Sequence, residues 1–229
     1  MSFWEVTQEL FRGFGVTLEL FILTLVLALP LGLLFALGSR SRLRPLRFLV
    51  RGFVYIIRGT PLMLQLLVVT LGPGILFGTQ HALTRWKCFN GNANLAYFCG
   101  ALLAFVINYA CYFSEIYRGG IDNIPKGQWE AGQVLGMKKS QIFFRIILLQ
   151  VVKSILAPIS NETVTLVKDT SLARTVSVVE VIYAADRITG HYALIWPLFY
   201  TGAFYLVFNF LVTWCFTTAE KRLSRFRLE

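Results

Sequence analysis

The chain has 229 residues, of which 56% are hydrophobic and only 15% are charged, well below the roughly 25% of ordinary soluble domains. A soluble protein of this size cannot bury that much apolar surface, so the composition argues against a soluble class. The net charge is +10, and the basic residues lie mainly between the apolar stretches. This pattern indicates the orientation of a membrane protein and not nucleic-acid binding.

The N-terminus has no basic n-region and no A-x-A-like site before its first long apolar run, so we expect no cleaved signal peptide. The four cysteines form no CxxC pair and no cluster with histidine at metal-ligand spacing, so no metal site is expected. Cys88 and Cys99 are both expected near the outer surface. A disulfide between them stays open, although unpaired small apolar residues are the favoured interpretation.

A membrane-spanning helix needs about 20 mostly apolar residues. Charge-free windows predict spans within residues 20–39, 59–84, 88–114 and 188–219. The second has its apolar core at 62–71 and is expected to end at Gly72, Pro73 and Gly74. The third has its core from Leu95, and the last is centred on residues 194–216.

A fifth apolar segment, residues 142–167, contains Lys153 and Glu162. Charges inside a bilayer are costly unless they face protein or water, so we predict a span whose polar stripe faces the interior of a helix bundle. The expected fold is therefore an all-α integral membrane protein, with five transmembrane helices in a single domain over residues 1–229.

The distribution of lysine and arginine predicts the orientation. Fifteen of the 22 basic residues follow the first, third or fifth predicted span, six lie on the other side, and Lys153 lies within a span. Because cytoplasmic segments carry the excess of basic residues, we expect the N-terminus outside and the C-terminus in the cytoplasm.

Residues 118–140, between the third and fourth spans, contain a predicted short helix at 125–135, about 16 Å long. Pro125 suits a first helical position, Gly136 suits the residue just past a helix end, and Ser140 is expected to cap the next span. Such a helix is too short to span and too polar for lipid.

Two interpretations of this helix stay open: it lies on the membrane surface, or it docks on a partner. Docking is favoured slightly by its small residues, which permit close backbone approach, and by its apolar anchors. The small residues are Ala131, Gly132 and Gly136, and the anchors are Trp129, Val134 and Leu135.

The same segment carries a motif, Glu130-Ala131-Gly132, then Gly136, then Ile147-Leu148-Leu149. It resembles the cytoplasmic signature of the permeases of polar amino-acid ABC importers, which have the type I importer fold: Glu-Ala-Ala, then Gly, then Ile-Leu-Pro. Further matches are RGTPL at 58–62, RGGI at 118–121, IPKGQ at 124–128, LGM at 135–137 and KDTSL at 168–172.

Two positions depart from the signature. Gly132 replaces the second alanine, which is expected to loosen the helix by up to about 1 kcal/mol. Leu149 replaces the proline and puts the kink expected there in question.

The resemblance implies a permease in the bacterial inner membrane that forms its pathway with a second permease, identical or paralogous. It implies separate ATPase subunits and an extracellular or periplasmic amino-acid-binding protein. The sequence has no G-x-x-x-x-G-K-[ST], so the chain is not expected to be an enzyme or to bind a cofactor; ATP and Mg would belong to the ATPase subunits. The coupling segment is expected at about 124–140, with contacts from Gln128, Trp129, Glu130, Ala131, Gly132 and Gly136.

An amino-acid zwitterion needs polar partners within the membrane, often near helix breaks. The candidate substrate-binding residues are Gln65, Asn108, Glu162, Lys168, Asp169 and Ser171. For each of them a structural hydrogen bond or ion pair is the alternative. Glu115 and Arg118 are interpreted as structural, and no chemistry is assigned to His81 or His191.

Three other functions remain to be weighed. A permease of the same class could carry another small solute, such as methionine or an inorganic anion. An ion-coupled secondary transporter or channel usually shows paired repeats with broken helices, which this sequence lacks. An intramembrane enzyme would need a catalytic constellation, and no Ser/His/Asp set, metal-ligand cluster or G-x-S-x-G is present.

Overall fold

The computed structural model describes residues 2–76 and 91–224, and within these ranges the regular structure is helical throughout. The expected all-α class is confirmed. In chain order the helices are α1 (Phe3–Ser39), α2 (Arg44–Arg58), α3 (Leu62–Leu76), α4 (Ala93–Asp122), α5 (Lys126–Val134), α6 (Lys139–Ile142), α7 (Leu148–Asp169), α8 (Val181–Tyr192) and α9 (Trp196–Ser224). A π-helical turn (Phe143–Ile147) joins α6 to α7, and a 3-10 segment (Thr170–Val176) follows α7.

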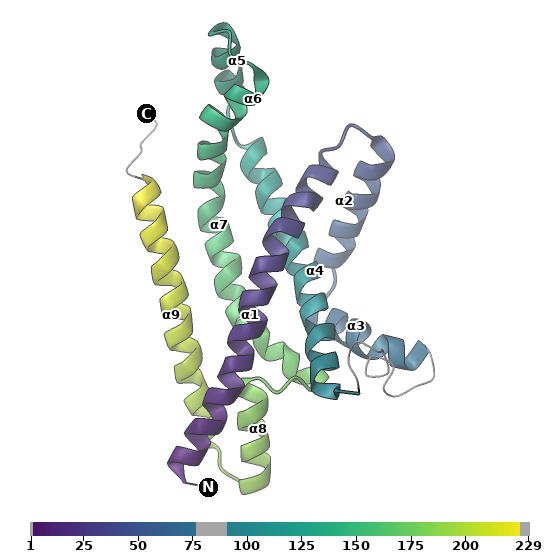
Figure 1. Ribbon diagram of the computed structural model, residues 1–229, viewed down its shortest axis with the longest axis vertical. Helices are drawn as coiled ribbons and strands as arrows, with labels where there is room; N and C mark the ends of the chain where they lie inside the picture. The colour runs from purple at the N-terminus through teal and green to yellow at the C-terminus, as the bar shows by residue number, and fades with distance from the viewer. Residues whose placement is uncertain (1, 77–90, 225–229) are drawn as a thin grey trace.

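Four of these stretches are long and apolar enough to cross a membrane: α1, α4, the run Lys139–Val176 and the run Trp196–Leu223. The pair α2 and α3, bent by 104°, is a fifth crossing if the two are taken together, which matches the expected five. Figure 1 shows α1 and α4 rising, α2 and α7 descending, and α9 rising again. The start of α1 and the end of α9 therefore lie at opposite ends of the bundle.

The second crossing differs from its predicted form. Residues 44–58, which fall between two predicted spans, form α2. The arginines of this segment share one face of an amphipathic helix, and a charge-free window cannot detect that pattern. The prediction that Gly72, Pro73 and Gly74 end the next helix is also wrong. Pro73 lies inside α3, which continues to Leu76.

The first and third crossings extend beyond their charge-free windows. Ser2 and Glu5 form a capping box that starts α1 seventeen residues earlier than predicted, with Glu5 N donating to Ser2 Oγ over 3.3 Å and Ser2 N to Glu5 Oε2 over 2.7 Å. At the far end of α4, Arg118 pairs with Glu115 at 2.5 Å and with Asp122 at 3.3 Å. These charges are neutralised on the helix itself, so α4 continues to Asp122.

The last two crossings needed two corrections. Ser140 lies inside α6, and the residue before the helix is Lys138, whose backbone N–H donates to Gln141 Oε1 over 2.8 Å. The window 188–219 merged two helices, because α8 ends at Tyr192 and a break with Ala193 at φ 53° separates it from α9.

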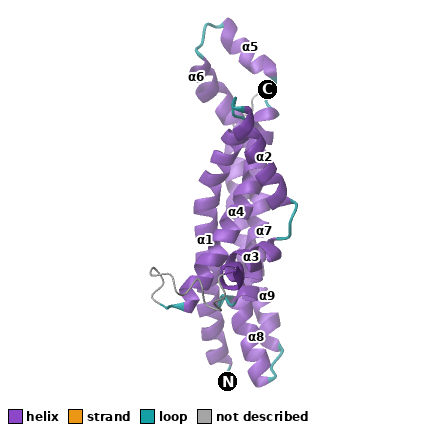
Figure 2. Ribbon diagram, turned by 90° about the vertical axis from the view of Figure 1, so that its right-hand side faces the viewer, coloured by secondary structure: helices purple, strands orange, loops and turns teal. Residues whose placement is uncertain are grey.

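The core lies where α1 crosses α4, which is the most extensive helix contact in the described part of the chain. Close approach depends on Gly32, where a Cβ atom would lie 2.9 Å from the carbonyl oxygen of Ala110. Phe105, Tyr109 and Phe113 of α4 fill this core. Figure 2 shows α5 and α6 projecting beyond the helix bundle at the end opposite the N-terminus. The fold thus places the bend between α2 and α3 within the bundle and the short helix α5 outside it.

Candidate translocation and coupling sites

The bend between α2 and α3 is held by the amide of Gln65. Its Nε2 donates to the carbonyl oxygen of Ile57 at 2.7 Å, and it lies 2.8 Å from Thr60 Oγ1 and 3.1 Å from the Thr60 carbonyl oxygen. Asn108 on α4 donates to Gln65 Oε1 over 3.0 Å. The structure therefore brings two of the predicted substrate residues together, but the Gln65 amide and the Asn108 Nδ2 group are already engaged at the bend.

Arg58, at the end of α2, is a candidate site residue that the sequence interpretation did not include. Its guanidinium lies 5.1 Å from the centre of the Tyr112 ring and its Nη1 lies 3.7 Å from Glu115 Oε2. A cavity of about 470 Å³ opens beside it, lined by Tyr55, Ile56, Arg58, Gly59, Thr60 and Tyr112. The available signal was a charge directly before the helix break of the RGTPL motif.

Two predicted carboxylates lie on the same side of the bundle as Arg58. Glu162 on α7 is half-buried and lies within electrostatic reach of both Arg58 and Asp169. Asp169 accepts a hydrogen bond of 2.7 Å from the hydroxyl of Tyr109. This region therefore combines one guanidinium with two carboxylates, which is the charge pattern that the carboxylate and ammonium groups of a zwitterion require.

Lys168 and Ser171 do not join this group in the same way. Lys168 is exposed, and Ser171 Oγ donates to the Lys168 carbonyl oxygen over 2.7 Å within its own helical turn. Their proposed contact with substrate stays a prediction.

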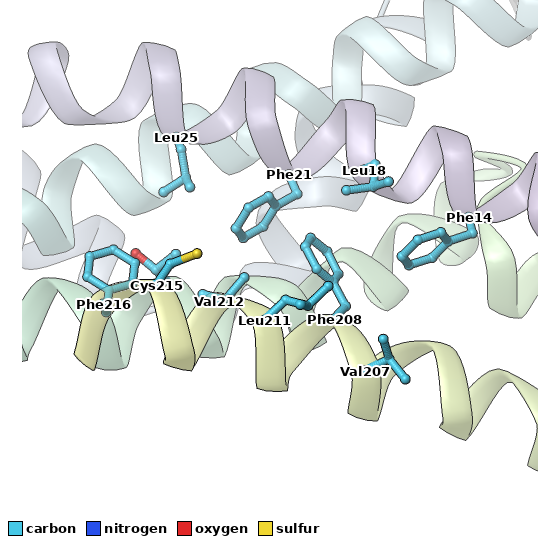
Figure 3. Close-up of a pocket in the computed structure, with 11 residues that line it drawn as sticks. Phe14, Leu18, Phe21, Leu25, Val207, Phe208, Leu211, Val212, Cys215 and Phe216 are labelled. Atoms are coloured by element: carbon cyan, nitrogen blue, oxygen red, sulfur yellow. The ribbon is translucent and has the colours of Figure 1, made fainter. Parts of the chain in front are cut away.

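A second cavity, of about 390 Å³, lies between α1 and α9 (Figure 3). Apolar side chains from both helices surround it, and the one polar side chain, Thr163, already donates to the Ile159 carbonyl oxygen over 2.7 Å. A zwitterion placed there would lose its hydration without compensation, so this cavity is unsuited to a polar solute.

The predicted short helix is present as α5, one residue shorter at each end than expected, with Pro125 directly before it. Gly136 has φ 69° and closes the helix, as predicted. Its N–H donates to Gln133 O over 2.9 Å and the N–H of Met137 donates to Gly132 O over 3.0 Å. This is the Schellman arrangement, which requires a left-handed residue after the helix.

The predicted coupling residues fall into two sets. Glu130, Ala131 and Gly136 are exposed, as is Gln128, which accepts a hydrogen bond of 3.2 Å from Gln150 Nε2. Trp129 and Gly132 face inward, where Trp129 packs on the cluster that contains Ile142, Ile147, Val151 and Ile155. The outer face of the helix therefore carries Glu130, and its C-terminal end carries two strongly exposed apolar side chains, Val134 at 86% and Leu135 at 76%.

The structure gives Gly132 a different role from the one expected from the sequence, which was to loosen the helix. A Cβ atom at this position would lie 2.7 Å from Ile142 Cγ1 and 2.9 Å from Ile142 Cδ1. The missing side chain therefore permits close packing of α5 on α6 within the chain, and this face of Gly132 is not open to a partner.

The sequence analysis also drew conclusions about the histidines, the cysteines and metal binding. His81 and Cys88 lie outside the described residues, so the pairing of Cys88 with Cys99 stays open. His191, to which no chemistry was assigned, packs edge-on against Tyr192 with ring centres 4.7 Å apart. Among residues 2–76 and 91–224, no group of three His, Cys, Asp or Glu side chains is placed to hold a metal ion.

Comparison with known families now decides the class. The profile described as "Binding-protein-dependent transport system inner membrane component" matches residues 28–225. The chain belongs to this family. The resemblance inferred from the motifs is thus confirmed, and the chain is a membrane-spanning permease.

Curated relatives and solved structures agree with this assignment. The permease is 36% identical to the L-cystine transport system permease protein TcyB of Bacillus subtilis, over 98% of this chain and 89% of the relative. It is 34% identical to the octopine transport system permease protein OccM of Rhizobium radiobacter, over 95% and 86%. A structure described as an amino acid ABC transporter with histidines matches with a TM-score of 0.82 and 26% identity, covering 95% of both chains.

Proposed function

We propose that this permease forms, with a second permease, the pathway of an ATP-driven importer for polar amino acids. The relatives supply the class of solute, since they are named for cystine, octopine and arginine transport. Within the permease, the proposal depends on one observation: Arg58, at the bend between α2 and α3, lies within electrostatic reach of Glu162, which in turn lies within electrostatic reach of Asp169.

The roles follow from the charges. The guanidinium of Arg58, at the edge of the cavity, is suited to the substrate carboxylate, because arginine can donate two parallel hydrogen bonds to it. Glu162 is suited to the ammonium group. Asp169 is already bonded to Tyr109, so it supports the negative side of the site without needing direct contact.

Coupling to ATPase subunits is assigned to α5. The helix projects beyond the bundle (Figure 1) and exposes Glu130, Val134 and Leu135. Exposed apolar side chains beside a charge are typical of a surface that a partner covers. The ATP and Mg would then be held by that partner.

The experiment that tests this function is ATP hydrolysis by the reconstituted complex. The permease is co-expressed with its ATPase and second permease, placed in nanodiscs, and assayed with the binding protein and one solute at a time. Stimulation by a polar amino acid but not by methionine or phosphate is expected. Stimulation only by a non-amino-acid solute would overturn the substrate class, and failure of any ATPase to co-purify would overturn the importer itself.

The proposed orientation places the α1–α2 turn in the cytoplasm. A variant with its native cysteines replaced and Arg42→Cys added tests this in intact cells. An impermeant thiol reagent should leave it unlabelled until the membrane is opened. Labelling from outside would reverse the topology.

A further inference from the structure

The turn between α1 and α2 is densely basic. Arg40, Arg42, Arg44 and Arg47 lie within eight residues, and the sequence contains no Asp or Glu between Glu19 and Glu115. We refer to residues 40–47 as the basic turn. Any acidic partner for it must therefore come from a distant helix or from outside the chain.

Within the described part of the chain, one of these four arginines has an acidic partner. Arg40 pairs with Asp122 at the end of α4. Arg42 and Arg44 are exposed and make no ion pair, and Arg47 has its Nε atom buried without an acceptor. A buried N–H without an acceptor is uncommon in native proteins, so this group calls for a partner that the described residues do not supply.

The backbone adds to the positive field at this point. α2 starts at Arg44 without a side-chain cap, because its preceding residue is Leu43. Pro45 has no N–H, and the N–H groups of Arg44 and Leu46 point out of the first turn. The N-terminus of a helix carries a partial positive charge and is suited to phosphate oxygens.

The position of the basic turn limits the occupant. The ion pair between Arg40 and Asp122 holds it level with the ends of the spanning helices α1 and α4. Figure 1 shows the turn below α5, at the end of the bundle where those helices stop. Around it are exposed apolar side chains, among them Leu43 at 65% and Phe48 at 79%. A phosphate carried on acyl chains fits this combination of charge and apolar surface, whereas a free phosphate would not use the apolar part.

We propose that the basic turn is a binding site for the phosphate headgroup of an anionic phospholipid, with Arg42, Arg44 and Arg47 as its ligands. Its acyl chains lie along the apolar face of α2 that begins at Leu46 and Leu49. Basic clusters directly beside a spanning helix attract anionic lipids by about fivefold in affinity for each Lys or Arg. The site is independent of the solute and of the ATPase.

The test uses the full-length permease in detergent and counts bound lipids by native mass spectrometry. Phosphatidylglycerol and phosphatidylcholine with identical acyl chains are compared at equal concentration. The wild-type chain should retain phosphatidylglycerol preferentially. The variant Arg42→Gln/Arg44→Gln/Arg47→Gln should lose more than tenfold of that preference, while replacement of the same three residues by lysine should keep most of it.

A matched control removes equal charge at the same end of the molecule: Lys126→Gln/Lys138→Gln/Lys139→Gln. These three side chains are exposed on the segment that includes α5 and α6, and their loss should leave the lipid preference unchanged. Circular dichroism checks that each variant folds. The double variant Arg42→Gln/Arg44→Gln changes only exposed side chains and should lose part of the lipid preference.

Three outcomes would overturn the proposal. The first is an unchanged preference in the triple arginine variant. The second is an equal loss in the lysine control, which would indicate net charge alone. The third is displacement of phosphatidylglycerol by inorganic phosphate at a concentration equal to that of the lipid, which would show that the acyl chains contribute nothing. If the first outcome comes together with lost co-purification of the ATPase, the basic turn belongs to a protein partner.

Discussion

The Cβ atom that alanine would carry at position 132 falls 2.7 Å from Cγ1 of Ile142, a side chain that is fully buried. Real Cβ atoms do not approach other heavy atoms so closely. The packing of α5 on α6 therefore depends on a glycine at the place where the family signature has alanine.

Gly132→Ala is expected to destabilise this region. Overpacking costs about 1–3 kcal/mol, while alanine in place of glycine gains at most about 1 kcal/mol of helix propensity, so the net loss is up to about 2 kcal/mol. Gly127→Ala is the matched control, because it lies on the same helix with no atom within 4 Å of the added Cβ; it should be neutral or stabilising. Hydrogen exchange of α5 measures both. Equal protection in the two variants would refute the packing explanation.

Gly136 tests the geometry of the C-terminal end of α5 separately. With φ 69° and no atom near an added Cβ, Gly136→Ala should cost about 1–2 kcal/mol from backbone conformation alone. Gly136→Asn should cost less, because asparagine tolerates the left-handed region. If the surface of Gly136 contacts an ATPase, the asparagine variant should still reduce solute-stimulated ATP hydrolysis. If Gly136→Asn hydrolyses ATP at the full rate and Gly136→Ala does not, the role of Gly136 is limited to the backbone conformation.

The sequence predicted those features that depend on local pattern. Charge-free windows found the apolar parts of α1, α3, α4 and α9, and the apolar segment 142–167 found α7 despite its two charges. Pro125 and Gly136 predicted both ends of α5. α2 was missed because its charges share one face, and α8 because twelve residues are too few for a hydropathy window. The role of Arg58 depends on Tyr112 and Glu115, which α4 brings to it from a distant part of the chain. The spacing of these residues in the sequence does not predict this contact.

The bend between α2 and α3 should depend on Gln65 more than on Asn108. Gln65→Leu removes the amide that approaches the Ile57 and Thr60 carbonyl oxygens at 2.7 and 3.1 Å. The expected loss is about 2–3 kcal/mol, since each hydrogen bond contributes about 1 kcal/mol. Asn108→Leu breaks only the 3.0 Å bond to Gln65 and should cost about half as much. Thermal unfolding in detergent compares them, and a larger loss for Asn108→Leu would contradict this order.

Glu180, in the connection before α8, should make stability depend on pH. Its carboxylate is fully buried and accepts hydrogen bonds from the N–H groups of Ile182 at 2.9 Å and Tyr183 at 2.7 Å. Burial raises the pKa of Glu180 from 4.5 to about 7, and the backbone donors and the Tyr205 hydroxyl oppose the shift only in part. The folded chain therefore holds this proton more tightly than the unfolded chain does.

The sign of the effect follows from that difference. Between pH 4.5 and pH 7 the folded state binds more protons at Glu180, so this contribution is complete below pH 4.5 and is lost as the pH rises to about 7. The slope is at most about 1.4 kcal/mol per pH unit. Glu180→Gln keeps an acceptor and cannot ionise, so the wild-type minus variant difference should fall across this range. A difference that does not change with pH would refute the assignment.

Glu162 is expected to contribute to transport, and Lys153 is not. The two residues lie nine positions apart on α7, about 2.5 turns, so they point to opposite sides of the helix. Glu162 lies within electrostatic reach of Arg58, which lines the cavity at the bend between α2 and α3. A charge-assisted hydrogen bond to a substrate ammonium group contributes about 1.5–3 kcal/mol, so Glu162→Gln should weaken the apparent solute affinity of transport by about tenfold or more. Lys153→Met, in the half of α7 nearer to α6, should transport normally.

Uptake of labelled solute into proteoliposomes measures both variants, with co-purification of the ATPase as the check on assembly. Normal uptake by Glu162→Gln together with impaired uptake by Lys153→Met would reverse the two assignments and move the pathway to the opposite face of α7.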